Sequence, residues 1–218
     1  MASAWYAFAR WATKTFFYSP RGPFSSSGEE NIPLTGGLIV APNHISYLDP
    51  PAVACGTKRR QLRFMAKEEL FHGFLGKLIT SLGAFPVKRG EGDTESIRKS
   101  IEILENGEAL LIFPEGTRSD GKRMLPINRG VAMLAKRTKV PVLPVAILGT
   151  QYVLPKGGGG QKHPMQIVYG QPFTYEEVAV GVNEKENRER FASELERRIL
   201  QLCNENGYAL RSASSPED

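Results

Sequence analysis

Short apolar runs recur along the chain, and polar or glycine-containing segments separate them. Runs of this kind are typical of strands that are buried on both faces of a sheet. Proline, glycine and serine dominate residues 19–36 instead, which are therefore predicted to be a connection. The predicted strands are residues 37–42, 62–66, 84–88, 109–113, 142–148 and 165–169.

Between most of these strands, apolar residues recur three and four positions apart, which is the spacing of one helix face. The first such segment carries Ile97, Ile101 and Leu104 on one face. The predicted helices are residues 94–106, 129–138 and 184–202. Strands that alternate with helices predict an α/β fold, in which helices flank a central sheet that is mostly parallel or mixed.

The length of 218 residues suits a single domain with a sizeable core. We expect this domain to span residues 37–205, since the predicted strands and helices all lie in this range. The residues that follow are mostly small or polar, so residues 206–218 are predicted to be a flexible tail.

The first eighteen residues predict an amphipathic helix that lies in a membrane interface. One face carries Trp5, Phe8, Ala9, Ala12 and Phe16, and the opposite face carries Arg10 and Lys14. Aromatic rings anchor such helices at the level of the headgroups, and cations meet anionic lipids. The alternative is an ordinary helix docked on the domain core. No apolar stretch reaches the roughly 18 residues that a membrane span needs.

The net charge of +5 and the pI of about 9.2 favour an anionic partner, such as nucleic acid, anionic lipid or a phosphorylated substrate. The cations are scattered, and neither zinc-ligand spacing nor an RNA-binding aromatic segment is present, so nucleic acid is not expected. A basic cluster at residues 58–63 either touches anionic headgroups or is a solvated turn. The short aromatic N-terminal segment and the apolar residues 71–82 favour a monotopic protein resting on one leaflet.

Two polar segments follow predicted strands, at the edge of the sheet where open α/β proteins form their sites. His44 and Asp49 follow the first of these strands. A histidine accepts a proton near neutral pH, and an aspartate fixes its tautomer and stabilises the imidazolium. No Gly-x-Ser-x-Gly elbow is present, so the expected nucleophile is a hydroxyl of the substrate. Alone, this pair is equally explained as a buried histidine satisfied by an acid.

Four blocks in fixed order reduce that ambiguity, because together they resemble the 1-acylglycerol-3-phosphate acyltransferases, the PlsC type of glycerolipid acyltransferase. They are the NHx4D (HX4D) block at 43–49, Gly83–Arg89, the FPEGTR block at 113–118 and Val140–Pro144. The resemblance covers roughly residues 37–170. It implies transfer of a fatty acyl group from acyl-CoA or acyl carrier protein to the sn-2 hydroxyl of 1-acylglycerol-3-phosphate. The product is phosphatidic acid, in phospholipid synthesis.

The resemblance also implies a role for each matching residue. His44 is expected to be the general base that Asp49 orients. The expected substrate-binding residues are Lys67, Arg89, Glu115, Gly116, Thr117 and Arg118. Arg89 would hold the substrate phosphate, because a guanidinium can bind two phosphate oxygens at once. The chemistry needs no metal ion and no cofactor, and no ligand spacing suggests a metal.

The expected partners are a lysophospholipid, acyl-CoA or acyl carrier protein, and a membrane lipid surface, without nucleic acid. The expected location is peripheral, on the cytoplasmic face of a membrane. Other acceptors share the same blocks: another lysophospholipid, glycerol-3-phosphate or a lipid amine. An inactive membrane-binding relative is a further alternative, and the presence of both His44 and Asp49 counts against it.

Overall fold

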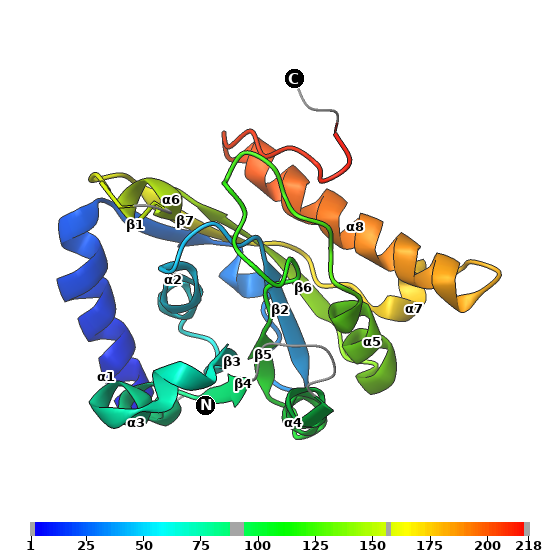
Figure 1. The fold of residues 1–218 in the computed structure, drawn as a ribbon, viewed down its shortest axis with the longest axis horizontal. Helices are drawn as coiled ribbons and strands as arrows, with labels where there is room; N and C mark the ends of the chain where they lie inside the picture. Colours follow the sequence, from blue (N-terminus) through cyan, green and yellow to red (C-terminus); the bar gives the residue numbers. More distant parts are fainter. Residues whose placement is uncertain (1–2, 88–93, 156–157, 216–218) are drawn as a thin grey trace.

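A seven-stranded sheet crosses the part of the chain that the computed structural model describes, residues 3–87, 94–155 and 158–215 (Figure 1). Its strands are β1 (Phe24–Ser27), β2 (Leu38–Pro42), β3 (Leu62–Lys67), β4 (Ala84–Val87), β5 (Ala109–Leu111), β6 (Val142–Leu148) and β7 (Met165–Tyr169). Their spatial order is β1-β7-β6-β2-β5-β3-β4. All neighbouring strands are parallel except β6 and β7, which confirms the predicted α/β fold with a mostly parallel, mixed sheet.

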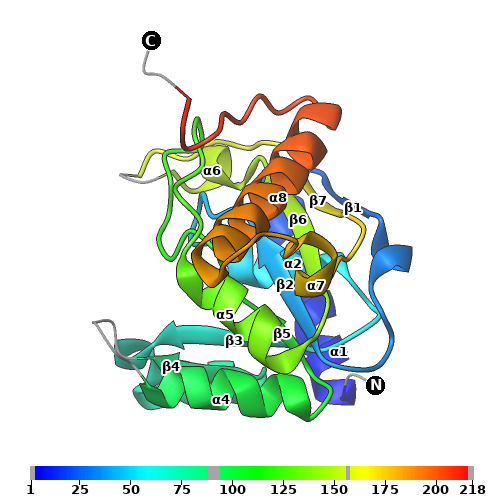
Figure 2. The same ribbon diagram turned by 90° about the vertical axis from the view of Figure 1, so that its right-hand side faces the viewer.

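Helices cover both faces of this sheet (Figure 2). They are α1 (Ala4–Ala12), α2 (Asp49–Gly56), α3 (Gly73–Ser81), α4 (Thr94–Glu105), α5 (Arg129–Thr138), α6 (Thr150–Val153), α7 (Tyr175–Val178) and α8 (Glu184–Glu205). Side chains of α4, α5 and α8 form one apolar cluster with the sheet, and α2 forms a second cluster on the opposite face. Along β2, Ile39 belongs to the first cluster and Val40 to the second. This double coverage explains why the strands read as continuous apolar runs.

The sequence prediction missed β1, which lies in the segment that we expected to be a connection. Phe24–Ser27 pairs in parallel with β7 at the edge of the sheet. Three of its four residues are serines, so no apolar pattern marks it. Backbone hydrogen bonds rather than buried side chains place such an edge strand, and composition does not reveal them.

The N-terminal helix both docks on the core and exposes aromatic rings. Tyr6 is buried on α1, and Tyr18 is buried at the end of the π-helical segment η1 (Thr13–Tyr18) that continues α1. The Tyr18 hydroxyl donates to the carbonyl of Leu48 at 2.7 Å. The exposed aromatic side chains of this region are Trp5, Phe8, Trp11 and Phe16. One face of the helix therefore docks on the core, and membrane binding by its exposed aromatic face stays a prediction.

The cations of this helix lie opposite the exposed aromatic rings, as the sequence predicts, and they contact the protein body. Arg10 turns toward the protein body, where a guanidinium nitrogen donates to the carbonyl of Thr57 at 3.0 Å. The Lys14 ammonium lies over the ring of Phe24, 5.1 Å from its centre. These contacts occupy the two side chains that we expected to meet anionic headgroups.

The basic cluster at residues 58–63 has mainly a structural role. The Arg60 guanidinium is nearly buried, and it donates to the carbonyls of Gly36 and Gly107 at 2.7 and 2.5 Å. Arg63 forms an ion pair with Glu108. These partners precede β2 and β5, so the cluster ties loops together at the amino ends of the strands, opposite the edge where the candidate site lies.

The segment that we expected to be a flexible tail packs against the protein over residues 208–213. Leu210 is buried, and backbone hydrogen bonds of 3.0 Å join Arg211 to Lys122 and Met124. One apolar side chain and a short backbone ladder are enough to hold a segment whose composition is small and polar. Residues 216–218 lie outside the described part of the chain.

Candidate active site

Two loops that leave β2 and β5 meet at the carboxyl edge of the sheet. The strands are parallel neighbours, with Val40 opposite Leu111. Their loops therefore leave side by side, as expected for this class of sheet. The amide of His44 donates to a carboxylate oxygen of Glu115 at 2.6 Å, and the amide of Ser119 donates to the His44 carbonyl at 2.8 Å. The loop that follows β5 thus holds the His44 backbone from both sides.

His44 and Asp49 form the pair that the sequence predicts. The Nδ1 atom of His44 lies 2.8 Å from Oδ2 of Asp49, the first residue of α2. Asp49 is fully buried, whereas the His44 side chain keeps 15% of its exposed area. The histidine side chain is therefore accessible to solvent, and the buried aspartate fixes its orientation.

Four donors surround the Asp49 carboxylate. Besides His44, its Oδ2 atom accepts from the amides of Ile45 and Ser46, each at 2.7 Å. Its Oδ1 atom accepts from the Thr150 hydroxyl at 2.6 Å. An ionised carboxylate accepts only, so the Nδ1 atom of His44 carries the proton. The Nε2 atom is left as the basic nitrogen of the neutral ring.

The His44 ring is also fixed by stacking. It lies on the ring of Phe113, with centroids 3.9 Å apart and an angle of 26° between the planes. Phe113 opens the FPEGTR block, immediately after β5. Asp49 and Phe113 together leave the imidazole little freedom to turn, which preserves the direction of Nε2.

Asn43 fixes the end of β2. Its side-chain amide donates to the Ile147 carbonyl at 3.0 Å, and its side-chain oxygen accepts from the Ile147 amide at 2.7 Å. Asn43 is fully buried, and both the nitrogen and the oxygen of its side-chain amide have hydrogen-bond partners on β6. These two hydrogen bonds join the His44 loop to β6, which ends at Leu148, two residues before Thr150.

Glu115 faces inward rather than into the open site. Its two carboxylate oxygens accept from the amides of His44 at 2.6 Å and Leu125 at 2.8 Å. Burial raises the pKa of Glu115 to about 7, and the two donated hydrogen bonds oppose that rise. The carboxylate therefore connects the His44 loop to both ends of the loop after β5, and its geometry is that of a positioning residue.

The next three residues turn outward. Gly116 has φ of 70°, a left-handed conformation that favours glycine, and it closes a tight turn onto the Phe113 carbonyl. Thr117 is exposed. The Arg118 guanidinium lies over the ring of Tyr47, 3.5 Å from its centre. Tyr47 belongs to the loop that carries His44, so this cation contacts the loop of the candidate base.

Of the two other predicted cations, only Lys67 belongs to the described part of the chain. Lys67 ends β3 at the same edge of the sheet and is exposed. No hydrogen bond or ion pair within the described residues joins it to His44 or to the 115–118 loop. Arg89 lies outside the described residues. Within those residues, no group of three or more His, Cys, Asp or Glu side chains is placed to hold a metal ion.

Three contributors escaped the sequence prediction as site residues: Asn43, Phe113 and Thr150. Each stands at the carboxyl end of β2, β5 or β6, where a polar or aromatic residue interrupts an apolar run. That position is a usable signal. It does not reveal which of the residues touches His44 or Asp49, because that depends on the folding of three separate loops.

The cysteines offer no alternative nucleophile within the described site. Burial raises the pKa of Cys55 to about 11 and that of Cys203 to about 12. Both thiols therefore stay protonated and unreactive near neutral pH. The arrangement of His44 and Asp49, beside the Arg118 guanidinium, suits removal of a proton from the hydroxyl of a substrate that carries an anionic group.

Comparisons with known proteins agree with this chemistry. Residues 24–148 match a family model described as Acyltransferase. The chain is 31% identical over 189 residues to the 1-acyl-sn-glycerol-3-phosphate acyltransferase of Bacillus subtilis, covering 85% of this chain and 91% of that protein. It is 36% identical over 114 residues to the enzyme of that name from Streptococcus pneumoniae, covering 51% of this chain and 41% of that protein.

The fold is similar to a solved structure. The crystal structure of the 1-acyl-sn-glycerophosphate (LPA) acyltransferase PlsC from Thermotoga maritima matches with a TM-score of 0.74 and 29% sequence identity. The match covers 90% of this chain and 79% of that one. These findings confirm the resemblance that the four sequence blocks indicate: the chain belongs to the acyltransferase family and is an enzyme of that class.

Proposed function

We propose that the enzyme transfers a fatty acyl group from an acyl-CoA or acyl carrier protein thioester to the sn-2 hydroxyl of 1-acylglycerol-3-phosphate, giving phosphatidic acid. The observation that carries this proposal is the His44–Asp49 pair, 2.8 Å apart, with no activated protein nucleophile in the described site. The Arg118 guanidinium lies on Tyr47 of the same loop. The names of the similar proteins from Bacillus subtilis and Thermotoga maritima support the same acceptor.

In this mechanism the Nε2 atom of His44 takes the proton of the acceptor hydroxyl. The hydroxyl oxygen attacks the thioester carbonyl carbon, and a tetrahedral intermediate forms. When that intermediate collapses, the carbon–sulfur bond breaks, and the imidazolium returns the proton to the departing thiolate. Asp49 stabilises the imidazolium in between, because its buried carboxylate accepts a hydrogen bond from the Nδ1–H group. The enzyme needs no metal ion or cofactor for these steps.

Arg118 supports the choice of a phosphorylated acceptor. A guanidinium binds phosphate oxygens in pairs, and the Tyr47 ring holds its plane. We assign Arg89 and Lys67 to the same phosphate, as the sequence blocks imply. Gly116 and Thr117 line the approach, where the tight turn brings backbone close to the acceptor.

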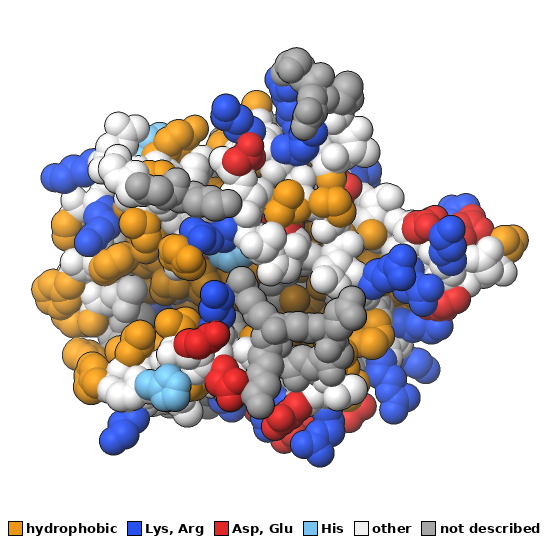
Figure 3. Space-filling view, in the orientation of Figure 1, with side chains coloured by type: hydrophobic (Ala, Val, Ile, Leu, Met, Phe, Trp, Pro, Cys, Tyr) orange, Lys and Arg blue, Asp and Glu red, His pale blue; other side chains and the backbone are white. Residues whose placement is uncertain are grey.

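An apolar patch supports binding at a membrane surface. The patch consists of Trp5, Phe8, Trp11, Phe16, Phe74 and Leu75, all of which are exposed. It covers α1, η1 and α3 (Figure 3), and a hydrogen bond of 3.0 Å between Trp5 and Ser81 joins the first and last of these elements. Exposed apolar patches rimmed by polar residues mark interaction surfaces. In the described residues, every helix is too short or too polar to cross a bilayer. We therefore propose peripheral binding, on the cytoplasmic face.

Replacing Phe16 and Phe74 by serine tests this surface. These side chains are 69% and 82% exposed, so the double variant should fold normally and bind anionic liposomes at least about tenfold more weakly. Co-sedimentation measures the effect. Val180→Ser with Val182→Ser is the matched control, since both valines are exposed outside the patch. Equal binding by the two double variants would contradict the assignment.

The function itself is tested by assaying acyl transfer from acyl-CoA and acyl carrier protein to a panel of acceptors. The panel is lysophosphatidate, lysophosphatidylcholine and glycerol-3-phosphate. We expect the highest kcat/KM with lysophosphatidate, because its exposed phosphate monoester suits Arg118. A preference for another acceptor would reassign the substrate while leaving the acyl transfer in place.

A further inference from the structure

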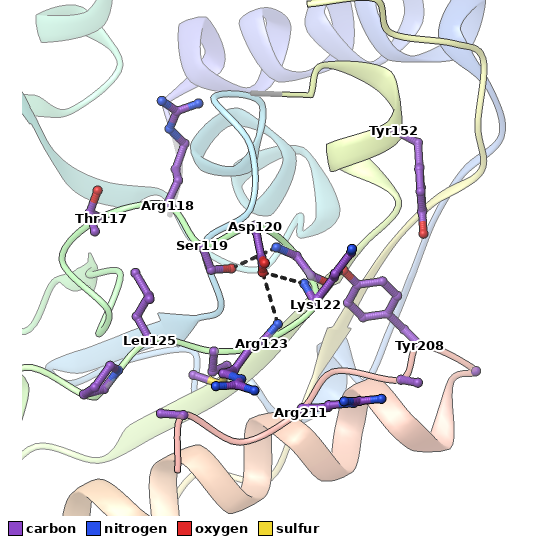
Figure 4. Close-up of a pocket in the computed structure, with 16 residues that line it drawn as sticks. Thr117, Arg118, Ser119, Asp120, Lys122, Arg123, Leu125, Tyr152, Tyr208 and Arg211 are labelled. Carbon is purple, nitrogen blue, oxygen red and sulfur yellow. Dashed lines mark hydrogen bonds between the residues drawn. The ribbon is translucent and has the colours of Figure 1, made fainter. Parts of the chain in front are cut away.

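A pocket adjoins the active site, and most of its lining residues have no role in the proposed steps. It has a volume of about 1200 Å³ and opens between the loop of residues 117–126 and the C-terminal segment of residues 207–213. Tyr152 contributes from α6 (Figure 4). Apart from the Thr117–Arg118 end of the FPEGTR block, the lining residues lie outside the four sequence blocks that indicated the family.

The pocket is strongly basic. Its described lining carries four cationic side chains and one carboxylate: Arg118, Lys122, Arg123, Arg211 and Asp120. Figure 4 shows Arg118 extending away from the other three cations, which gather around the centre and lower part of the pocket. Arg118 thus serves the catalytic side of the loop, and the remaining cations serve the pocket.

The single carboxylate is directed into the loop. An oxygen of Asp120 accepts from the amides of Lys122 at 2.9 Å and Arg123 at 3.2 Å. The hydrogen bond from the Lys122 amide is the main cause that lowers the pKa of Asp120. The acid therefore folds the loop that presents the cations, and it leaves the pocket with an excess of positive charge.

Two tyrosines complete the wall. The Tyr208 hydroxyl donates to the Gly121 carbonyl and accepts from the side-chain amide of Gln151 at 2.9 Å. Tyr152 is exposed on α6. The Tyr152 ring contacts the His163 ring, with centroids 4.4 Å apart. Two tyrosine rings beside several cations suit a ligand that joins a flat aromatic group to phosphates, and the volume is ample for a nucleotide.

The pocket lies within reach of the candidate base. Ser119 lines it, and its amide donates to the His44 carbonyl at 2.8 Å. The chain from Ser119 to Lys122 spans at most about 11 Å, by the reach of an extended backbone. A molecule whose reacting group lies at His44 can therefore place its anionic end among these cations.

The position also fits a donor that does not come from the bilayer. Figure 1 places the 117–126 loop and the C-terminal segment at the top of the view and α3, which carries part of the apolar patch, at the lower left. A polyanionic group is repelled by anionic headgroups. A site for it away from α3 keeps it in water while the lipid acceptor stays at the membrane.

We propose that this pocket binds the 3′-phosphoadenosine diphosphate end of an acyl-CoA, and so selects acyl-CoA as the donor. The proposal rests on the acyl transfer proposed above, since the thioester must then lie at His44. The cations bind the phosphates, the tyrosines pack against the adenine ring, and the pantetheine arm leads back past Ser119 to the base.

Calorimetry with adenosine 3′,5′-bisphosphate tests the pocket without turnover. The full chain should bind this probe saturably, and Lys122→Glu should weaken binding at least tenfold. The Lys122 side chain is exposed, and its backbone bonds do not depend on it, so the fold is expected to persist. Lys185→Glu makes the same charge change on the exposed face of α8 and should bind within twofold of wild type. Absence of saturable binding, or equal binding by both variants, overturns the proposal.

Kinetics separate the donor from the acceptor. Lys122→Glu should raise KM for acyl-CoA at least tenfold and leave KM for lysophosphatidate within twofold. Arg211→Gln, which keeps its backbone bonds, should raise KM for acyl-CoA in the same direction. A rise in KM for lysophosphatidate instead would show that the pocket binds the acceptor. Acyl transfer from acyl carrier protein alone would show that the enzyme does not use the nucleotide-bearing donor. Either result overturns the proposal. Loss of acyl transfer with every donor and acceptor would refute the proposed function, while the calorimetric result would still decide the pocket.

Discussion

His44→Ala is expected to lower acyl transfer to lysophosphatidate by about 10³-fold, within the range that general acid–base catalysis contributes. The variant keeps the loop, because the amide and carbonyl of residue 44 make the bonds to Glu115 and Ser119. Asp49 keeps three of its four donors, so the free energy of unfolding should fall by only about 1–2 kcal/mol. Initial rates and a thermal melt of the same preparation measure both quantities.

The control for this variant is His72→Ala. His72 is exposed at the start of α3, and its side chain makes no helix-capping bond. With a detergent-dispersed substrate, His72→Ala should retain wild-type kcat. Full activity in His44→Ala would remove this residue as the base. A parallel loss of kcat and of folded protein would instead mean that the ring matters for stability alone.

The predictable part of the structure is the part that apolar periodicity encodes. Six strands and three long helices lie where the apolar pattern predicts them, because each contributes apolar side chains to one or both of the two clusters. The serine-rich β1 gives no such pattern, and neither does the C-terminal segment that Leu210 fixes. Backbone pairing decides both, and it depends on neighbours that are distant in the sequence.

The candidate site also has one part that the sequence predicts and one part that it does not. The motif spacing predicts that His44 and Asp49 pair, and the structure places them 2.8 Å apart. The sequence does not show that Glu115 turns inward to two amides while Arg118 turns outward to Tyr47. These opposite directions of the two side chains depend on the left-handed φ of 70° at Gly116. The amino-acid composition of the loop does not reveal that angle.

The surroundings of Asp49 yield a contrast between two substitutions. In Asp49→Ala, the amides of Ile45 and Ser46 lose their acceptor inside the protein. Each unsatisfied buried donor costs about 1–3 kcal/mol, so the loss of both bonds should lower the free energy of unfolding by about 2–6 kcal/mol. With the His44 tautomer no longer fixed, activity should fall by about 10³-fold or more. Chemical denaturation and initial rates measure the two losses.

Asp49→Asn should behave differently, because the site can accommodate an amide. The asparagine oxygen can take the Oδ2 position and accept from the same three N–H groups, and the Thr150 hydroxyl can rotate to accept from the asparagine nitrogen. The tautomer of His44 is then preserved, and only the charge that stabilises the imidazolium is lost. We expect about a 10²-fold loss of kcat, with stability close to wild type. Adding Thr150→Val removes the rotating acceptor, so the double variant should be less stable than Asp49→Asn by about 1–3 kcal/mol. Equal stability of Asp49→Asn with and without Thr150→Val would show that Thr150 does not hold the residue at position 49.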